Sequence, residues 1–321
     1  MSITDVIVNY RRFLKRRNYS HNTLKSYMNI LKHFVLWINV PIEQVDRWKV
    51  AEYTDHLLQK RLKPKTINCH LACIRVFYDY LHHEEGIKVK NPVRRGSALR
   101  MPKPLPKHLR DEEVVILFDV IGKPRDRAMF RVMLRSGLRV EEVANLHLRD
   151  LDLKRNRIYV RNGKGQKDRV VYVSGDAQND VVSYLRVRPP SREKSVFLVE
   201  KGPYTGKPIS VRGIQKRIEY YAQKAGLKMS SHHLRHTMAT QMLNAEAEVT
   251  TIQELLGHNG INTTERYCSV SNVKVMRDYF KAMEVVMKRS ALVDKNHSRP
   301  GYQFKKGLWD FCEKKGLKTK P

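Results

Sequence analysis

Apolar side chains recur at helical spacing through the first 90 residues and predict four amphipathic helices. The four patterns begin near Val6, Leu24, Val50 and Ile67. Ser20 is a candidate N-cap for the second helix, and Gly86 is placed to end the fourth. Short helices joined in this way predict a compact helical bundle over residues 1–90.

The composition changes after the fourth helix. Residues 91–107 hold four prolines together with five basic side chains, and prolines at this density interrupt helix and sheet alike. The segment is predicted to be an extended, basic linker, whose 17 residues reach ~55 Å at ~3.3 Å each. The prolines are Pro92, Pro102, Pro104 and Pro106.

A mixed pattern follows the linker. Asp111 opens a helix with acidic residues in its first turn, and a second helix runs from Pro124 to Gly137. Two β-type segments, 157–160 and 169–173, flank a glycine-rich turn. Further helices are predicted at 211–225, 232–244, 250–256 and 263–267.

These patterns predict a fold that is mainly α with a small antiparallel β-sheet. A mixed α+β domain covers residues 108–287, including a helix over 273–287, and a basic tail covers 288–321. Within the tail, an apolar stripe leaves two alternatives open: a poorly ordered segment, or one that packs on this or another protomer and regulates assembly. The stripe consists of Phe304, Leu308, Phe311 and Cys312.

The charge balance points to a polyanionic partner. The chain has 62 Lys and Arg against 32 Asp and Glu, a formal net charge of +30. The excess is +14 over residues 1–110, +9 over 111–287 and +7 over 288–321. A surplus spread over every part fits a protein that encloses DNA or RNA, although a ribosomal or structural nucleic-acid binder would share it.

Several classes of protein are disfavoured by the same sequence. No run approaches the ~18 apolar residues of a membrane helix, and the N-terminus lacks the apolar core of a signal peptide. Four scattered cysteines are too few for a disulfide framework or a four-thiolate zinc site. We therefore expect no membrane association and a reducing, cytoplasmic location, in association with the nucleoid.

Five short motifs carry residues suited to chemistry, although each is weak alone. Arg139, in Ser136-Gly137-Leu138-Arg139, reads equally as a surface ion-pair residue, and Lys164, in Gly163-Lys164-Gly165, as a solvated lysine. The glycine-rich turn lacks the spacing of a phosphate-binding P-loop. The other three motifs are His232-His233-Leu234-Arg235-His236, Leu255-Leu256-Gly257-His258 and Thr263-Thr264-Glu265-Arg266-Tyr267.

The histidines also suggest a metal site. His232 and His236 share a helix face, and His258 could be a third ligand. However, the residue after His232 is not the glutamate of a zinc-protease motif, and Arg235 within the cluster would repel a dication. We expect no metal and no cofactor, with capping or core histidines as the remaining alternative.

Taken together, the motifs supply what cleavage of a phosphodiester by a side-chain nucleophile requires. The planar forks of Arg139 and Arg235 match phosphate oxygens and offset the charge of the transition state. Tyr267 is a competent nucleophile once it loses its proton, and Lys164 can protonate the leaving oxygen.

The five motifs, in this order, resemble the tyrosine recombinase (phage integrase) family, and especially its Xer-type members. The resemblance extends to about residue 285 and includes the proline-rich connector and the sequences Arg139-Val140-Glu141-Glu142 and Gly163-Lys164-Gly165-Gln166-Lys167-Asp168-Arg169. His258 precedes Tyr267 by nine residues and follows Arg235 by 23. Both intervals fit the family. Ser231 stands where proline is common in relatives, and the long tail also departs from the pattern.

The resemblance implies a site-specific DNA recombinase and a role for each motif residue. Tyr267 would attack the scissile phosphate and form a 3′-phosphotyrosyl link, Arg139 and Arg235 would hold the phosphate, and Lys164 would protonate the 5′-oxygen. His232 would assist proton transfer, and His258 would donate a hydrogen bond to the phosphate.

The family also implies partners. Four protomers would act on two duplexes. In each protomer, the helical bundle would be a core-binding domain, and this domain and the catalytic domain would clamp the DNA from opposite sides. Glu142 would orient the basic cluster. Accessory proteins and the target site stay unspecified. The candidate contacts to the DNA backbone are Lys25, Lys63, Lys65 and Arg75.

Three other functions remain open at this stage. A catalytically silent DNA-binding protein could use the same scaffold, a type IB topoisomerase shares the phosphotyrosyl chemistry, and a zinc nuclease could use the histidines. Chromosome-dimer resolution is not distinguished from integration, excision or transposition, although the long tail favours a mobile element.

Overall fold

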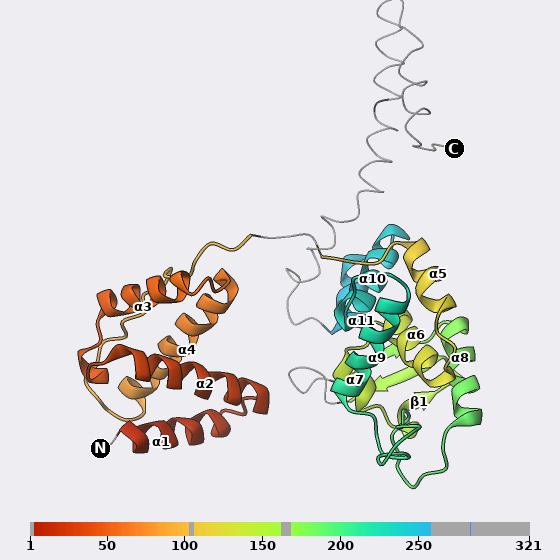
Figure 1. Ribbon diagram of the computed structural model, residues 1–321, viewed down its shortest axis with the longest axis horizontal. Coiled ribbons are helices and arrows are strands. Elements are labelled where there is room, and N and C mark those ends of the chain that lie inside the picture. Colours follow the sequence, from red (N-terminus) through yellow and green to blue (C-terminus); the bar gives the residue numbers. More distant parts are fainter. Residues whose placement is uncertain (1–2, 103–105, 162–167, 258–282, 284–321) are drawn as a thin grey trace, which may run out of the picture. The chain divides into compact units, whose positions relative to one another are not determined.

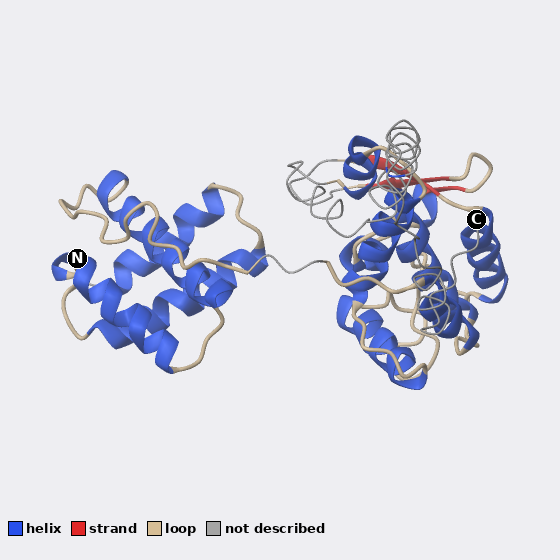
Figure 2. Ribbon diagram, turned by 90° about the horizontal axis from the view of Figure 1, so that it is seen from above, coloured by secondary structure: helices blue, strands red, loops and turns tan. Residues whose placement is uncertain are grey.

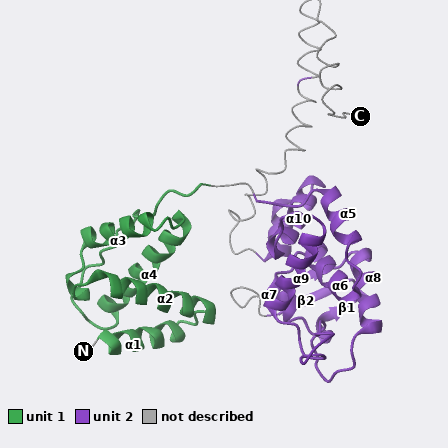
Figure 3. Ribbon diagram, in the orientation of Figure 1, with its two compact units in different colours: residues 1–104 green, residues 105–321 purple. Residues whose placement is uncertain are grey.

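The computed structural model describes residues 3–102, 106–161, 168–257 and 283, and it divides the chain into two compact units, 1–104 and 105–321 (Figures 1 and 3). Most of the described secondary structure is helical, with one small antiparallel sheet in the second unit. The predicted fold class is therefore confirmed. The predicted helices at 263–267 and 273–287 lie outside the described residues, apart from Met283.

The first unit is the predicted four-helix bundle. Its helices are α1 (Ile3–Arg16), α2 (His21–Ile38), α3 (Arg47–Gln59) and α4 (Pro64–His83), with a 3₁₀ turn, η1, at Ile42–Gln44. Ser20 caps α2 as predicted, because its Oγ accepts a hydrogen bond from the Thr23 amide at 3.2 Å. Aromatic rings fill the core: Tyr10 packs edge-on against Phe77 with ring centroids 5.1 Å apart.

Part of the segment predicted as a linker is attached to this bundle. The side-chain amide of Asn91 donates through Nδ2 to the Arg75 carbonyl at 2.9 Å, and the Val93 side chain is buried in the bundle core. Further along, Asn68 on α4 accepts from the Leu99 amide at 2.8 Å and donates to the Leu99 carbonyl at 3.0 Å. Residues 91–99 therefore follow the surface of the bundle rather than extending away from it.

The second unit is built around α6. Helices α5 (Asp111–Asp119) and α6 (Pro124–Ser136) are followed by the short α7 (Val140–Ala144) and a 3₁₀ turn, η2 (Leu148–Asp150). Helix α6 buries residues on most of its faces and packs against α8 and α10. The remaining helices are α8 (Gly175–Val187), α9 (Val211–Lys224), α10 (Ser231–Asn244) and α11 (Val249–Leu256).

The sheet contains three antiparallel strands in the order β1 (Leu151–Asp152), β2 (Arg157–Val160) and β3 (Arg169–Tyr172), and Figure 2 shows them together at one side of the unit. Ile158 on β2 pairs with Leu151 on β1 and with Val171 on β3. The inward side chains of β2 and β3 alternate with outward ones and join the core of the unit. Helices α7 and α8 and strand β1 were not predicted from the sequence.

Candidate active site

The turn between α6 and α7 sets the position of Arg139. Gly137 ends α6 in the left-handed conformation, with φ of 63°, and a Cβ at this position would lie 2.9 Å from Leu256 Cδ2 and 3.2 Å from Met238 Sδ. The backbone therefore approaches α10 and α11 more closely than any residue with a side chain would allow. Arg139 follows two residues later as the N-cap residue of α7.

Glu142, in the first turn of α7, binds the Arg139 backbone and two guanidiniums. Its carboxylate accepts hydrogen bonds from the Arg139 amide and from Arg139 Nη1, each at 2.8 Å. It also accepts two bonds from Arg169, from Nη1 and from Nη2, each at 2.8 Å. Each carboxylate oxygen therefore accepts two hydrogen bonds, and the side chain is only 7% exposed.

The charge state of Glu142 follows from these contacts. Burial alone would raise the pKa of this carboxyl, but hydrogen bonds and charge from Arg169, and then from Arg139, outweigh burial and lower the pKa below its ordinary value. Glu142 is thus held as a carboxylate, which fits the orienting role expected of it.

Three arginines meet at the C-terminal end of α11. Arg169 Nε donates to the Leu255 carbonyl at 2.9 Å, Arg235 Nη2 donates to the Leu256 carbonyl, and Arg139 Nη2 donates to the Gly257 carbonyl at 3.1 Å. These three carbonyls are consecutive and form the negative end of the helix dipole, where cations are favoured. Arg235 is nine-tenths or more buried and also donates through Nη1 to the Gly137 carbonyl. The structure therefore brings Arg139 and Arg235 to the same end of α11.

His232 lies one turn before Arg235 on α10, and its side chain is exposed. The neighbouring His233 is half-buried, and its Nδ1 accepts from the Ser230 amide at 2.9 Å. Burial, and then the charges of Lys107 and His232, lower the pKa of His233, so it serves as a neutral capping residue for α10.

Among the residues that the structure describes, no three His, Cys, Asp or Glu side chains are grouped so as to hold a metal ion.

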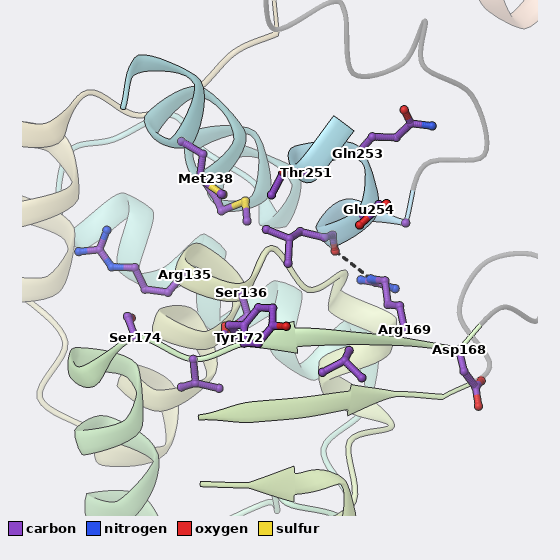
Figure 4. A pocket seen from close by; sticks show the side chains of 15 residues that line it. Arg135, Ser136, Asp168, Arg169, Tyr172, Ser174, Met238, Thr251, Gln253 and Glu254 are labelled. Atoms are coloured by element: carbon purple, nitrogen blue, oxygen red, sulfur yellow. Dashed lines mark hydrogen bonds between the residues drawn. The ribbon is translucent and has the colours of Figure 1, made fainter. Parts of the chain in front are cut away.

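A cavity of about 1060 Å³ adjoins the arginine cluster, between β3 and the helices α10 and α11 (Figure 4). Arg169 stands at one side of it, and the dashed line marks its bond to the Leu255 carbonyl. Gly257 also lines the cavity, whereas Arg139 and Arg235 do not. The cavity is thus a neighbour of the arginine pair rather than the space that the pair encloses.

Three predicted site residues lie outside the described residues: Lys164, His258 and Tyr267. Arg169 was not singled out from the sequence. The sequence offered two signals: Arg169 ends the motif that contains Lys164, and the acidic Glu142 follows Arg139. Only the folded chain shows that the Arg169 and Glu142 side chains pair.

The predicted DNA contacts all lie in the first unit. Lys25 on α2, Lys63 before α4 and Lys65 in its first turn are exposed, and Arg75 on α4 is half-buried. Lys25 lines a shallow groove of about 610 Å³ along α2 together with Lys32, Met28 and three polar residues. In the described part of the chain, none of the helices is long and apolar enough to cross a membrane.

The described part of the site places a half-buried and a buried arginine at the end of α11, in a strongly basic chain that begins with a helical bundle, and this combination is typical of proteins that act on the DNA backbone. Comparison with known proteins gives the particular family. Residues 107–273 match the model of the phage integrase family, and residues 7–85 match the phage integrase N-terminal SAM-like domain.

Relatives extend over nearly the whole chain. Tyrosine recombinase XerC of Thermodesulfovibrio yellowstonii is 33% identical over 288 residues, which cover 86% of this chain and 95% of the relative. Tyrosine recombinase XerC of Syntrophus aciditrophicus is 32% identical over 303 residues, with 87% and 97% covered. The solved Tn1549 transposon integrase in complex with transposon right end DNA has a TM-score of 0.70 at 20% identity, and the match covers 82% of this chain and 94% of that one.

The chain therefore belongs to the phage integrase family, as a Xer-like tyrosine recombinase. It is an enzyme, a site-specific DNA recombinase.

Proposed function

We propose that this recombinase cleaves and rejoins duplex DNA with Tyr267 as nucleophile and Arg139 and Arg235 as the phosphate-binding pair. The convergence of these two arginines on the end of α11 carries the proposal. Gly257, where α11 ends, stands ten residues before Tyr267 in the sequence. The tyrosine-bearing segment is therefore joined directly to the part of the fold that fixes the arginines.

The chemistry is a balanced exchange of esters. The Tyr267 oxygen forms a bond to phosphorus, the bond from phosphorus to the 5′-oxygen breaks, and a 3′-phosphotyrosyl link results. Lys164 gives a proton to the 5′-oxygen, and His232 assists removal of the phenol proton. Arg139, Arg235 and a hydrogen bond from His258 stabilise the charge that develops on the phosphate. Attack by the 5′-hydroxyl of a partner duplex reverses the steps and completes strand exchange, and the scheme requires no metal or nucleotide.

Assembly and domain organisation belong to the same proposal. We assign DNA binding to residues 1–90 and catalysis to 108–287, with a basic tail at 288–321; of the segment 91–107 between the two domains, residues 91–99 lie on the bundle and 100–107 form the connection. Exposed lysines on α2 and at the start of α4 support a role for Lys25, Lys63 and Lys65 in backbone contacts, with Arg75 nearby. Four protomers on two duplexes, at the nucleoid in the cytoplasm, would complete the reaction.

A nicked suicide duplex tests the mechanism. After cleavage, the short fragment that carries the free 5′-hydroxyl diffuses away, so religation is prevented. The wild-type enzyme should therefore accumulate as protein linked to a DNA 3′ end on denaturing gels. Tyr267→Phe should abolish the adduct while DNA binding in gel shifts persists. An adduct that survives in this variant, or one that vanishes in chelator, contradicts the proposal.

The adduct assay, together with assays of supercoil relaxation and recombination, separates the remaining alternative functions. A silent DNA-binding protein gives no adduct from either form. Relaxation of supercoiled DNA without regard to sequence, by a monomer, would indicate topoisomerase activity instead. Recombination between two copies of a site, with a tetramer on sizing columns, supports the full scheme.

A further inference from the structure

Arg169 connects three parts of the second unit that are far apart in the chain. It is the first residue of β3, it contacts Glu142 in the first turn of α7, and it contacts the last turn of α11. Residues 142, 169 and 255 are thereby fixed against one another by a single side chain.

The contacts of Arg169 use the whole guanidinium fork. Nη1 and Nη2 each donate to a different oxygen of Glu142 at 2.8 Å, and Nε donates to the Leu255 carbonyl at 2.9 Å. The side chain is only 11% exposed. A lysine would present a single ammonium group here and could not reproduce this planar, two-pronged contact.

Gly257 packs against the same side chain. A Cβ built on Gly257 would lie 3.1 Å from Arg169 Cδ and 3.2 Å from Nη1, and the backbone φ is 57°. The end of α11 therefore rests on the Arg169 side chain, and little space remains for either group to move without the other.

We propose that Arg169 is a positioning residue of the recombinase: through Glu142 it aligns Arg139, and through the Leu255 carbonyl it fixes the end of α11 that binds Arg139 and Arg235. This inference rests on the proposed function and deepens it. Three of the five N–H groups of Arg169 are directed at the carboxylate and the carbonyl, and we assign its effect on the phosphate to the other two arginines that these groups hold in place.

The test uses full-length protein and the nicked suicide duplex, with enzyme in excess so that the rate of the first cleavage is measured. Arg169→Met removes the charge and keeps the apolar stem, and Arg169→Lys keeps the charge without the fork. Arg161→Met is the matched control, because Arg161 flanks the same hairpin at the end of β2 and pairs with Asp150 at 2.8 Å without contacting Glu142 or α11.

We expect Arg169→Met to cleave about 100-fold more slowly than Arg161→Met, since misplacement of a catalytic group by about 1 Å costs a factor of this order. The affinities of the two variants for the intact site should agree within about threefold, because each has lost one positive charge. Arg169→Lys should cleave at an intermediate rate.

The pH profile separates positioning from a loss of folded protein. Within the residues that the structure describes, the charged groups that bind Glu142 are Arg139, at the N-cap of α7, and Arg169 on β3. Without Arg169 the carboxyl retains one guanidinium, so its pKa should rise and the acid-side fall in cleavage rate should move to higher pH. Thermal melts at each pH measure the folded fraction, and the profiles are compared as cleavage rate per folded molecule, which removes the contribution of partial unfolding.

Two results would overturn the inference while leaving the proposed function intact: cleavage by Arg169→Met at the rate of the Arg161→Met control, or a lower rate with an unmoved pH profile. Failure of the wild-type protein to form an adduct through Tyr267 would instead overturn the proposed function. If Arg169→Met does not fold, Arg169→Lys carries the test, and a wild-type rate and profile in that variant would refute the role of the fork.

Discussion

Glu142 is the carboxylate that neutralises two arginines of the site, Arg139 and Arg169. Two guanidiniums and one backbone amide bind it in the interior, where solvent screens their charges weakly. Removing the carboxylate would leave Arg139 and Arg169 close together without the charge that compensates them. Loss of one member of such a buried group costs about 3–5 kcal/mol.

We therefore predict that Glu142→Gln is less stable than the wild type at neutral pH and that the difference shrinks in acid. The folded-state pKa lies below the ordinary value of 4.5, so the carboxylate contributes stability that is fully present above about pH 4.5 and is lost as pH falls through the folded-state value. Denaturant titrations at pH 7 and at several values below 4.5 measure the difference. A gap that stays constant across this range would contradict the assignment of the lowered pKa to Glu142.

Gly137 gives a second prediction at the same scale. Alanine here would take a left-handed conformation, at about 1–2 kcal/mol, and would also press its Cβ against Leu256 and Met238. Because the Gly137 carbonyl accepts from Arg235, Gly137→Ala should be destabilised and should also cleave more slowly than the wild type.

Gly226→Ala is the control for Gly137→Ala. Gly226 has a similar φ of 67°, but a Cβ there meets nothing within 4 Å. Gly226→Ala should show the cost of the left-handed conformation alone, with normal cleavage. Equal losses of stability in the two variants, measured by thermal denaturation, would show that the contact with α11 contributes nothing.

At the scale of elements, the sequence predicted those helices that bury a broad apolar stripe. Helix α4 buries nine residues, and it was predicted from six of them: Ile67, Leu71, Ile74, Phe77, Tyr78 and Leu81. Helix α8 buries only Ala177, Val181 and Tyr184 and owes much of its position to ion pairs with α6, such as Asp180 with Arg131 at 2.9 Å. Strand β1 has two residues. Ala177, Val181 and Tyr184 do follow helical spacing, so α8 was predictable and was missed, whereas two residues are too few for β1 to show a pattern.

The candidate site was predictable in its residue types but not in its arrangement. Arg139 and Arg235 were identified from their motifs. Arg235 donates to the backbone carbonyls of Gly137 and Leu256, and Arg139 donates to that of Gly257. Every residue has a backbone carbonyl, so the sequence does not indicate which carbonyl groups will bind an arginine side chain. The role of Arg169 was missed for the same reason.

Helix α3 offers a test of local sequence control. The Asp46 carboxylate accepts from the Trp48 amide at 3.0 Å and the Lys49 amide at 2.9 Å, which caps the helix. Asp46→Ala should lower stability by about 1 kcal/mol and speed hydrogen exchange in the first turn of α3. Asp55→Ala, an exposed site on the same helix, should change stability by less than about 0.5 kcal/mol. Similar exchange rates in both variants would argue against the cap.

For the whole molecule, the net charge of +30 predicts that binding to DNA depends strongly on salt. If the protein contacts six to ten phosphates, affinity for its site should fall by about 10³–10⁵-fold between 50 and 200 mM salt. Lys63→Ala should reduce the slope of log affinity against log salt by about one, whereas Asp119→Asn should leave that slope unchanged. Filter binding across this range measures the slopes, and an unchanged slope for Lys63→Ala would remove this residue from the backbone contacts.

The attachment of Leu99 to Asn68 has a consequence for avidity. With residues 91–99 held on the bundle, only the eight residues 100–107 connect the two units, a span of at most ~26 Å at ~3.3 Å each. Once one unit has bound DNA, a connection this short keeps the other at a local concentration of the order of millimolar. If both units bind DNA, as proposed, the two surfaces together would bind more tightly than either alone, and the gain would come from chain length rather than from any additional contact.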